Sequence, residues 1–162
     1  MLGRCLVSAC RRENLDIIVI VLGAGTKSQR TSDSIHLINY VYKNFQMYDF
    51  TEFVDNSFKN FIANPSSNIT IHKTLKKPEF ELSKINFLLP IQKTNIDNFK
   101  SSIYTLNYID SPIYKDSKIG ILQVYVNNTP VLSVDINVKN GVSKTNTLEY
   151  FIYILKSIAK CR

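Results

Sequence analysis

The sequence lacks the features of a membrane-spanning, exported or metal-binding protein. No apolar run in its 162 residues approaches the ~20 residues that a helix needs to cross a bilayer. Met1 is not followed by the basic and apolar regions of a signal peptide, so we expect a cytoplasmic location for the chain as it is written. The three cysteines, Cys5, Cys10 and Cys161, form no Cys-x-x-Cys pair, which favours ordinary thiols over a zinc or redox site.

Residues suited to catalysis or cofactor binding are also scarce. His36 and His72 are the two histidines, and neither has the spacing of a metal ligand, so we interpret both as structural. Gly23-Ala24-Gly25 follows an apolar run but does not complete the Gly-x-Gly-x-x-Gly pattern of a dinucleotide-binding loop. We therefore expect no cofactor and no metal.

The composition is that of a globular protein with a positive charge. Hydrophobic residues make up 44% of the chain, and the formal net charge is +7, which favours an anionic partner such as a membrane surface, a cell-wall polymer or nucleic acid. Nucleic acid is disfavoured, because the aromatic residues do not cluster with Lys or Arg on one strand face as stacking platforms do. We expect no nucleic-acid partner.

Two apolar runs open the chain. Cys5 to Cys10 ends at basic residues, and Leu15 to Leu22 is almost continuous in Ile, Val and Leu, as in a strand that is covered on both faces. Glu13-Asn14 supplies a turn between them. The pattern predicts two antiparallel central strands, in which Cys5 and Cys10 point to opposite faces.

A helical period begins at Ser32, with a possible N-cap at Thr31, Ser32 or Asp33. We expect this helix to lie across the two strands and to cover one face of them. Its expected apolar face consists of Ile35, Ile38, Val41, Tyr42 and Phe45.

Short alternating runs follow, and they predict a small antiparallel β-domain. Asn127-Asn128 suits the two-residue turn of a hairpin, because Asn tolerates a positive φ. The predicted strands are Tyr48–Val54, Ser67–Leu75, Phe80–Leu89, Ser101–Ile109, Ile119–Val126 and Val131–Val138.

The last stretch, Asn146 to Arg162, predicts an amphipathic helix capped by Asn146 or Thr147. A helix with an apolar arc and basic residues beside it can lie in an anionic membrane interface. Alternatively, the arc packs on the β-domain. The residues that we expect to face the membrane are Phe151, Ile152, Leu155 and Ile158, with Lys156 and Lys160 beside them.

Two parts of the chain resemble serine-type D-alanyl-D-alanine carboxypeptidases, the low-molecular-mass penicillin-binding proteins. In order and spacing, Gly3 to Phe45 resembles the end of their peptidase domain, where a Lys-Thr-Gly strand precedes Gly-x-Cys/Ala-Leu-Val-x-x-Ala-x-Arg. Ser111-Pro112-Ile113, Lys118 to Leu122 and the strand after it resemble the β-rich C-terminal domain of the same family. The family's usual Gly-Asp turn is replaced here by Asp116-Ser117.

The motifs that the resemblance implies for catalysis are not assembled in this sequence. The family uses a Ser nucleophile and its Lys in Ser-x-x-Lys, a Ser-x-Asn contact and Lys-Thr-Gly. Ser157 to Lys160 has the first spacing and Ser66 to Asn68 the second, but their order is reversed. No Lys-Thr pair precedes Gly; these pairs begin at Lys73, Lys93 and Lys144. We expect no catalytic residue and no activity in the chain as given.

The resemblance implies a mixed α+β fold divided into a peptidase-domain end at 1–46, a β-rich domain at 47–140 and an amphipathic helix at 141–162. The whole enzyme would trim peptidoglycan stem peptides at the extracytoplasmic face of the bacterial plasma membrane. This portion would reach that substrate through the missing catalytic domain, and would act as sheet support, spacer and membrane tether. The alternative is a stand-alone, non-catalytic binding or scaffold protein on the membrane or cell wall.

Overall fold

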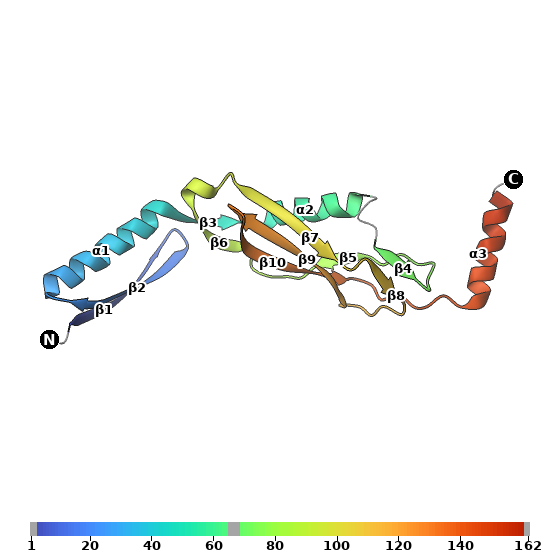
Figure 1. Cartoon of the computed structure of the whole chain (residues 1–162), viewed down its shortest axis with the longest axis horizontal. Coiled ribbons are helices and arrows are strands. Elements are labelled where there is room, and N and C mark those ends of the chain that lie inside the picture. Colours follow the sequence, from blue (N-terminus) through green and yellow to red (C-terminus); the bar gives the residue numbers. More distant parts are fainter. Residues whose placement is uncertain (1–2, 65–68, 161–162) are drawn as a thin grey trace. The chain divides into compact units, whose positions relative to one another are not determined.

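The computed structural model of the chain describes residues 3–64 and 69–160. The chain forms two compact units, one of Met1–Glu52 with Phe87–Phe99 and the other of Phe53–Asn86 with Lys100–Arg162. The fold is mixed α+β, as predicted, with antiparallel sheets and a C-terminal helix (Figure 1).

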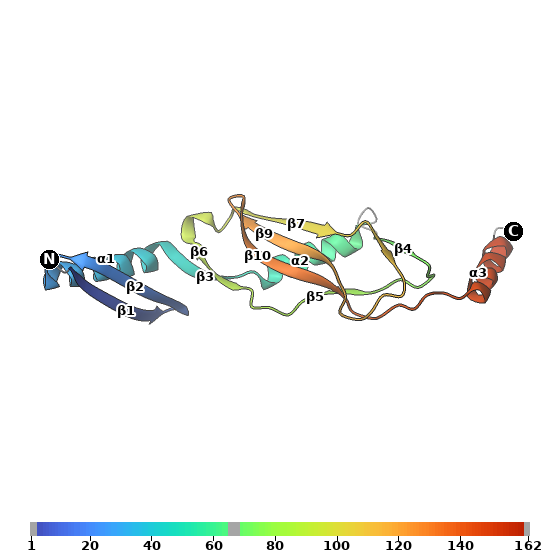
Figure 2. The ribbon, with the colours of Figure 1, turned by 60° about the horizontal axis from the view of Figure 1, so that its bottom comes forward.

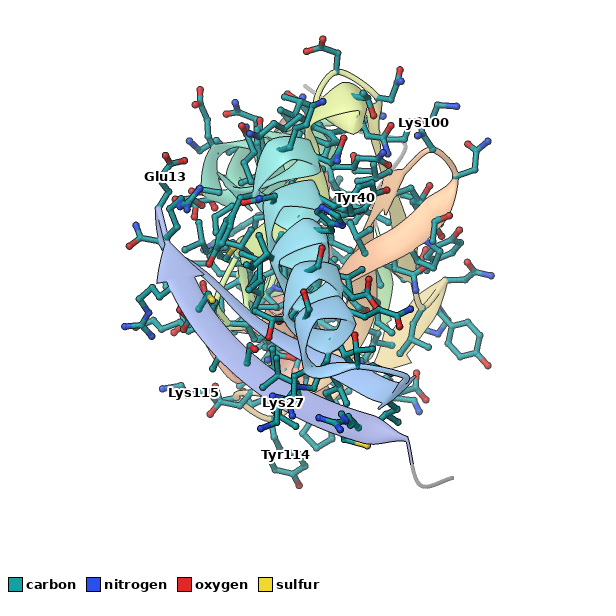
Figure 3. The ribbon with its side chains drawn as sticks, turned by 90° about the vertical axis from the view of Figure 1, so that its left-hand side faces the viewer. Glu13, Lys27, Tyr40, Lys100, Tyr114 and Lys115 are labelled. Atoms are coloured by element: carbon teal, nitrogen blue, oxygen red, sulfur yellow. The ribbon has the colours of Figure 1, made fainter. Side chains whose placement is uncertain are left out.

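In the first unit, β1 (Arg4–Arg12) and β2 (Leu15–Ala24) form the predicted antiparallel hairpin. Glu13 and Asn14 make its turn, with φ of 50° and 63°. Helix α1 (Lys27–Asn44) covers one face of the hairpin, and Figure 3 shows this unit end on, with Glu13 at the turn. The core under the helix consists of Val19, Val21 and Ala24, with Leu6, Ile17 and Ile38 packed against it.

The predicted start and apolar face of this helix are partly wrong. Thr26 is the N-cap, and its hydroxyl accepts a hydrogen bond of 3.0 Å from the N–H of Gln29. Thr31 lies inside the helix, where its hydroxyl donates to the carbonyl of Lys27. Ile35 is 51% exposed rather than packed. Phe45 is not helical, because the chain turns there into β3 (Phe45–Asp49).

The first unit also holds a second two-stranded sheet and an aromatic cluster. Strand β3 pairs antiparallel with β6 (Leu88–Gln92), which a short 3-10 helix, η2 (Lys93–Asn95), follows. The rings of Tyr48, Phe50 and Phe99 lie with centroids 4.8 to 4.9 Å apart. These tilted and edge-on contacts are typical of stable aromatic packing.

The second unit is built on a four-stranded antiparallel sheet in the order β5-β10-β9-β7, made of Phe80–Leu82, Thr129–Val138, Lys118–Val126 and Phe99–Thr105. The predicted hairpin turn is confirmed, since Asn127 and Asn128 have φ of 48° and 64°. The hairpin strands carry the core of this unit. The fully buried side chains of these two strands are Leu122, Val124, Val134, Ile136 and Val138.

The predicted strand Tyr48–Val54 is wrong beyond Asp49, because helix α2 (Thr51–Ala63) follows. Asp49 starts the turn into the helix by accepting a hydrogen bond of 2.9 Å from the N–H of Thr51. The helix runs along the four-stranded sheet in both Figures 1 and 2. Its Val54 is fully buried.

Three other predicted strands are shorter or divided. Ser67–Leu75 contains β4 (Thr70–His72), although residues 67 and 68 lie outside the described ranges. Phe80–Leu89 divides into β5 and the start of β6, and Ser101–Ile109 divides into β7 and β8 (Tyr108–Asp110). Strands β4 and β8 form a parallel pair, in addition to the antiparallel sheet that the sequence predicts for this part of the chain.

Candidate functional site

The first unit exposes an apolar sheet face. We call this the outer sheet face; it consists of Val7, Ala9, Ile18, Ile20 and Leu22. The four larger side chains are 58% to 73% exposed. Cross-strand pairs Val7 with Ile20 and Ala9 with Ile18 make the face continuous. The prediction that Leu15 to Leu22 is covered on both faces is therefore wrong within the described chain, because α1 covers one face and nothing described covers the other.

Both edges of this sheet are also open. Within residues 3–64 and 69–160, β1 and β2 pair with each other and with no other strand. An edge strand presents N–H and C=O groups to which another strand can pair. The first unit thus offers an apolar face and a pairing edge side by side, which is the geometry of a sheet that continues.

Polar contacts fix α1 on the opposite face. The hydroxyls of Ser8 and Ser34 lie 2.9 Å apart, and Arg30 donates through Nη1 to the carbonyl of Cys5 at 3.1 Å. The Tyr42 hydroxyl donates to the carbonyl of Leu15 at 3.3 Å. The three hydroxyls are satisfied by each other or by the backbone, so these contacts hold the helix on the sheet. Within the described residues, Nε of Arg30 is buried without a hydrogen-bond partner.

An exposed ion pair lies at the turn end of the outer sheet face. Arg11 forms a two-pronged contact with Asp16, in which Nη2 to Oδ2 is 2.5 Å. The hydrogen bond from Arg11 lowers the pKa of Asp16 below its usual range. Both side chains are well exposed, at 76% and 60%, so the pair contributes little to stability.

The C-terminal helix α3 (Thr147–Lys160) begins as predicted, with the Asn146 side chain accepting from the N–H of Glu149 at 2.8 Å. Its apolar residues are solvent-exposed: Phe151 by 58%, Ile152 by 42%, Leu155 by 52% and Ile158 by 64%. Lys156 is exposed as well, and the side chain of Lys160 lies outside the described part. Contact of this apolar arc with a membrane stays a prediction, as does its alternative, packing on the β-domain.

The described helices include none long and apolar enough to span a membrane. The described residues also contain no group of three or more His, Cys, Asp or Glu side chains placed to hold a metal ion. Cys5 and Cys10 are free thiols in strand β1, as expected from their opposite faces, whereas Cys161 lies outside the described residues.

The described serine and threonines of the motif-like sequences make hydrogen bonds within the chain. The Ser157 hydroxyl donates to the carbonyl of Ile154 at 2.8 Å, while Ser66 to Asn68 lie outside the described residues. Thr74 and Thr145, from two Lys-Thr pairs, meet with hydroxyls 3.4 Å apart. The nearby Lys73 ammonium is paired with Asp110 at 2.6 Å.

The sequence did not predict a pocket in the second unit, which we call the α2–β4 pocket. Its volume is about 770 Å³, and its walls come from the end of α2, from β4 and from the segment Thr74 to Phe80. The adjacent Lys76 and Lys77, followed by Pro78, were the available sequence signal. The polar and apolar residues around this pair follow neither the period of a strand nor that of a helix, so the sequence does not indicate a common face.

No protein-family model and no curated protein matches the chain. Several solved structures are similar to the chain. D-alanyl-D-alanine carboxypeptidase DacD from Francisella tularensis is similar with a TM-score of 0.56 and 18% identity over 87% of this chain. Penicillin binding protein 5 from Haemophilus influenzae is similar with a TM-score of 0.60 and 17% identity over 88%. The chain spans 33% and 40% of their lengths. The resemblance seen in the sequence is confirmed for the fold.

Proposed function

We propose that this chain is the C-terminal portion of a D-alanyl-D-alanine carboxypeptidase and that its first unit supports the sheet of the catalytic domain. The outer sheet face carries this proposal. The solved carboxypeptidases match most of this chain but only 33% and 40% of their own length, and the unit that resembles their peptidase domain has an apolar face and an open edge.

The strand expected beside β1 is the Lys-Thr-Gly strand that the resemblance implies. That strand would satisfy the free N–H and C=O groups of the β1 edge, and the segments around it would cover the outer sheet face. Burying a Val, Leu or Ile side chain contributes about 1.5–3 kcal/mol. Covering Val7, Ile18, Ile20 and Leu22, which are 58% to 73% exposed, would therefore stabilise the assembled domain.

In this proposal the second unit is a spacer and α3 is a tether at the extracytoplasmic face of the bacterial plasma membrane. The spacer role is supported by a self-contained core around Leu122 and Val134, both fully buried. The tether role is supported by the exposed apolar arc of α3 and by the net charge of +7. The substrate would be peptidoglycan stem peptides, bound by the catalytic portion.

The experiment is to recover the native protein from its own cells with an antibody against residues 47–140, measure its intact mass and incubate it with a fluorescent penicillin. A species much heavier than 18.6 kDa that becomes labelled supports the proposal. An unlabelled species of 18.6 kDa contradicts it.

The second candidate is a stand-alone binding or scaffold protein on the membrane or cell wall. It is favoured by the second unit, whose buried core includes Val124, Ile136 and Val138 and needs no further sheet. The same recovery experiment distinguishes the two candidates, because the scaffold would be found at 18.6 kDa without a penicillin label.

A further inference from the structure

The α2–β4 pocket has the size and lining of a ligand site. Its volume of about 770 Å³ lies within the ~300–1,000 Å³ of small-molecule pockets. All of its walls belong to the second unit. Seven of the twelve described lining residues are apolar: Phe61, Ile62, Ile69, Ile71, Leu75, Pro78 and Phe80.

Most polar groups of the pocket are already engaged. The Thr74 hydroxyl accepts from the N–H of Lys76 at 3.2 Å and lies 3.4 Å from the Thr145 hydroxyl. Glu79 forms an ion pair with Lys139 at 3.1 Å. Asn64 is already engaged in an interaction with another group of the chain. A sugar, nucleotide or peptide, which needs several free donors and acceptors, would therefore find few partners inside the walls.

Two positively charged side chains of the described lining have no ion-pair partner. Lys76 and Lys77 both line the pocket, and neither makes an ion pair with any described residue. Among the described lining residues the one carboxylate is Glu79, which forms an ion pair with Lys139. The described lining thus combines seven apolar side chains with two exposed ammonium groups.

We propose that the α2–β4 pocket binds a single-chain amphipathic anion of the fatty-acid class. The hydrocarbon lies against Ile71, Leu75 and Phe80, and the carboxylate lies beside Lys76 and Lys77. Burial of the hydrocarbon supplies most of the affinity, because ion pairs at exposed lysines are weak. The lysines favour an anionic head group over a neutral one. This inference does not depend on the proposed carboxypeptidase function.

The test uses the full chain and 11-(dansylamino)undecanoic acid, whose fluorescence rises when the group enters an apolar site. We expect saturable binding of the monomeric probe, displacement by dodecanoate and weaker displacement by dodecanol, which has the same chain without the charge. No saturable binding, or equal displacement by both competitors, overturns the proposal. So does enhancement that occurs only with anionic vesicles, since a bilayer surface would then be the partner.

Variants locate the site. Lys76→Gln with Lys77→Gln should weaken probe binding about three- to tenfold, as expected for two exposed ion pairs. The matched control is Lys84→Gln with Lys115→Gln, which removes the same charge from exposed lysines outside the pocket and should leave binding unchanged. Leu75→Asp, at a side chain already 38% exposed, should weaken binding more than the lysine pair. Equal effects of the test and control pairs contradict the site.

Discussion

Gly120 occupies a position where a side chain does not fit. A Cβ on Gly120 would lie 2.5 Å from the carbonyl oxygen of Tyr104 and 2.8 Å from Cγ2 of Thr105. The same residue stands at the centre of Lys118 to Leu122, one of the stretches that match the β-rich domain of the resembled family. The glycine of that match is therefore explained by the close approach of β9 to β7, because the approaching atom is backbone and cannot move alone.

Gly120→Ala should destabilise the second unit by about 1–3 kcal/mol, the usual cost of overpacking. Urea unfolding followed by circular dichroism measures this change. The control is Gly25→Ala, where the nearest atom to the new Cβ is the end of the Gln29 side chain at 3.5 Å. Equal stabilities of the two variants would show that β9 can move away from β7.

Asp110 on β8 contacts two side chains at the end of β4, the strand with which β8 pairs in parallel. Lys73 donates to it at 2.6 Å, His72 lies 3.6 Å away, and the hydrogen bond from Lys73 lowers the pKa of Asp110. A carboxyl whose pKa is lower in the folded state stabilises the fold above its unfolded pKa, and this contribution is lost as the pH falls through the folded pKa.

Lys73→Met should raise the pKa of Asp110 towards the ordinary aspartate value of about 3.9, and NMR titration of its carboxyl carbon measures this shift. Asp110→Asn should make the stability of the second unit less dependent on pH in the acid range below pH ~5. An unchanged Asp110 titration in Lys73→Met would mean that this exposed pair does not persist in solution.

At the scale of elements, the sequence predicted the two hairpins and the C-terminal helix. Leu15 to Leu22 was recognised as a strand because of its unbroken Ile, Val and Leu, and the Asn127-Asn128 turn because two adjacent residues tolerate a positive φ. The segment that covers a strand could not be predicted in the same way. Apolar residues such as Ile18 and Leu22 indicate that a face favours burial, but they do not say which segment covers it.

Helix α2 shows why other elements could not be predicted. Phe53, Phe58 and Phe61 favour a strand by local propensity, but their spacing places them on a helix that buries Val54 in the core of the second unit. The α2–β4 pocket was missed for a related reason, because its walls combine the end of this helix with a strand and a loop from later in the chain. Such sites depend on tertiary packing.

The outer sheet face should cause the chain as given to self-associate. Ile20→Lys places a charge on this face, where Ile20 is 58% exposed, and should reduce association at high protein concentration without loss of stability. Light scattering and urea unfolding measure the two quantities. The control Val19→Lys, at a side chain 7% exposed under α1, should unfold the first unit. A parent chain that is monomeric at every concentration tested would contradict the prediction.

At the scale of the whole molecule, the positive charge and α3 act together in the proposed tether. The full chain should sediment with anionic vesicles and much less with neutral ones, because anionic lipid attracts basic residues near the surface. A chain truncated after Val142 should stay in the supernatant. A second test variant, Phe151→Ser with Leu155→Ser, keeps the charge and removes apolar area, so it should also lose binding. Equal sedimentation of full and truncated chains would exclude α3 as the tether.

The division into two units has a mechanical consequence. The chain passes from one unit to the other between residues 52 and 53, between 86 and 87, and again between 99 and 100. Three backbone connections therefore join the units, and cutting one of them leaves the units joined by the other two. In the proposed spacer role, a pull applied at α3 would reach the first unit without relying on a single peptide segment.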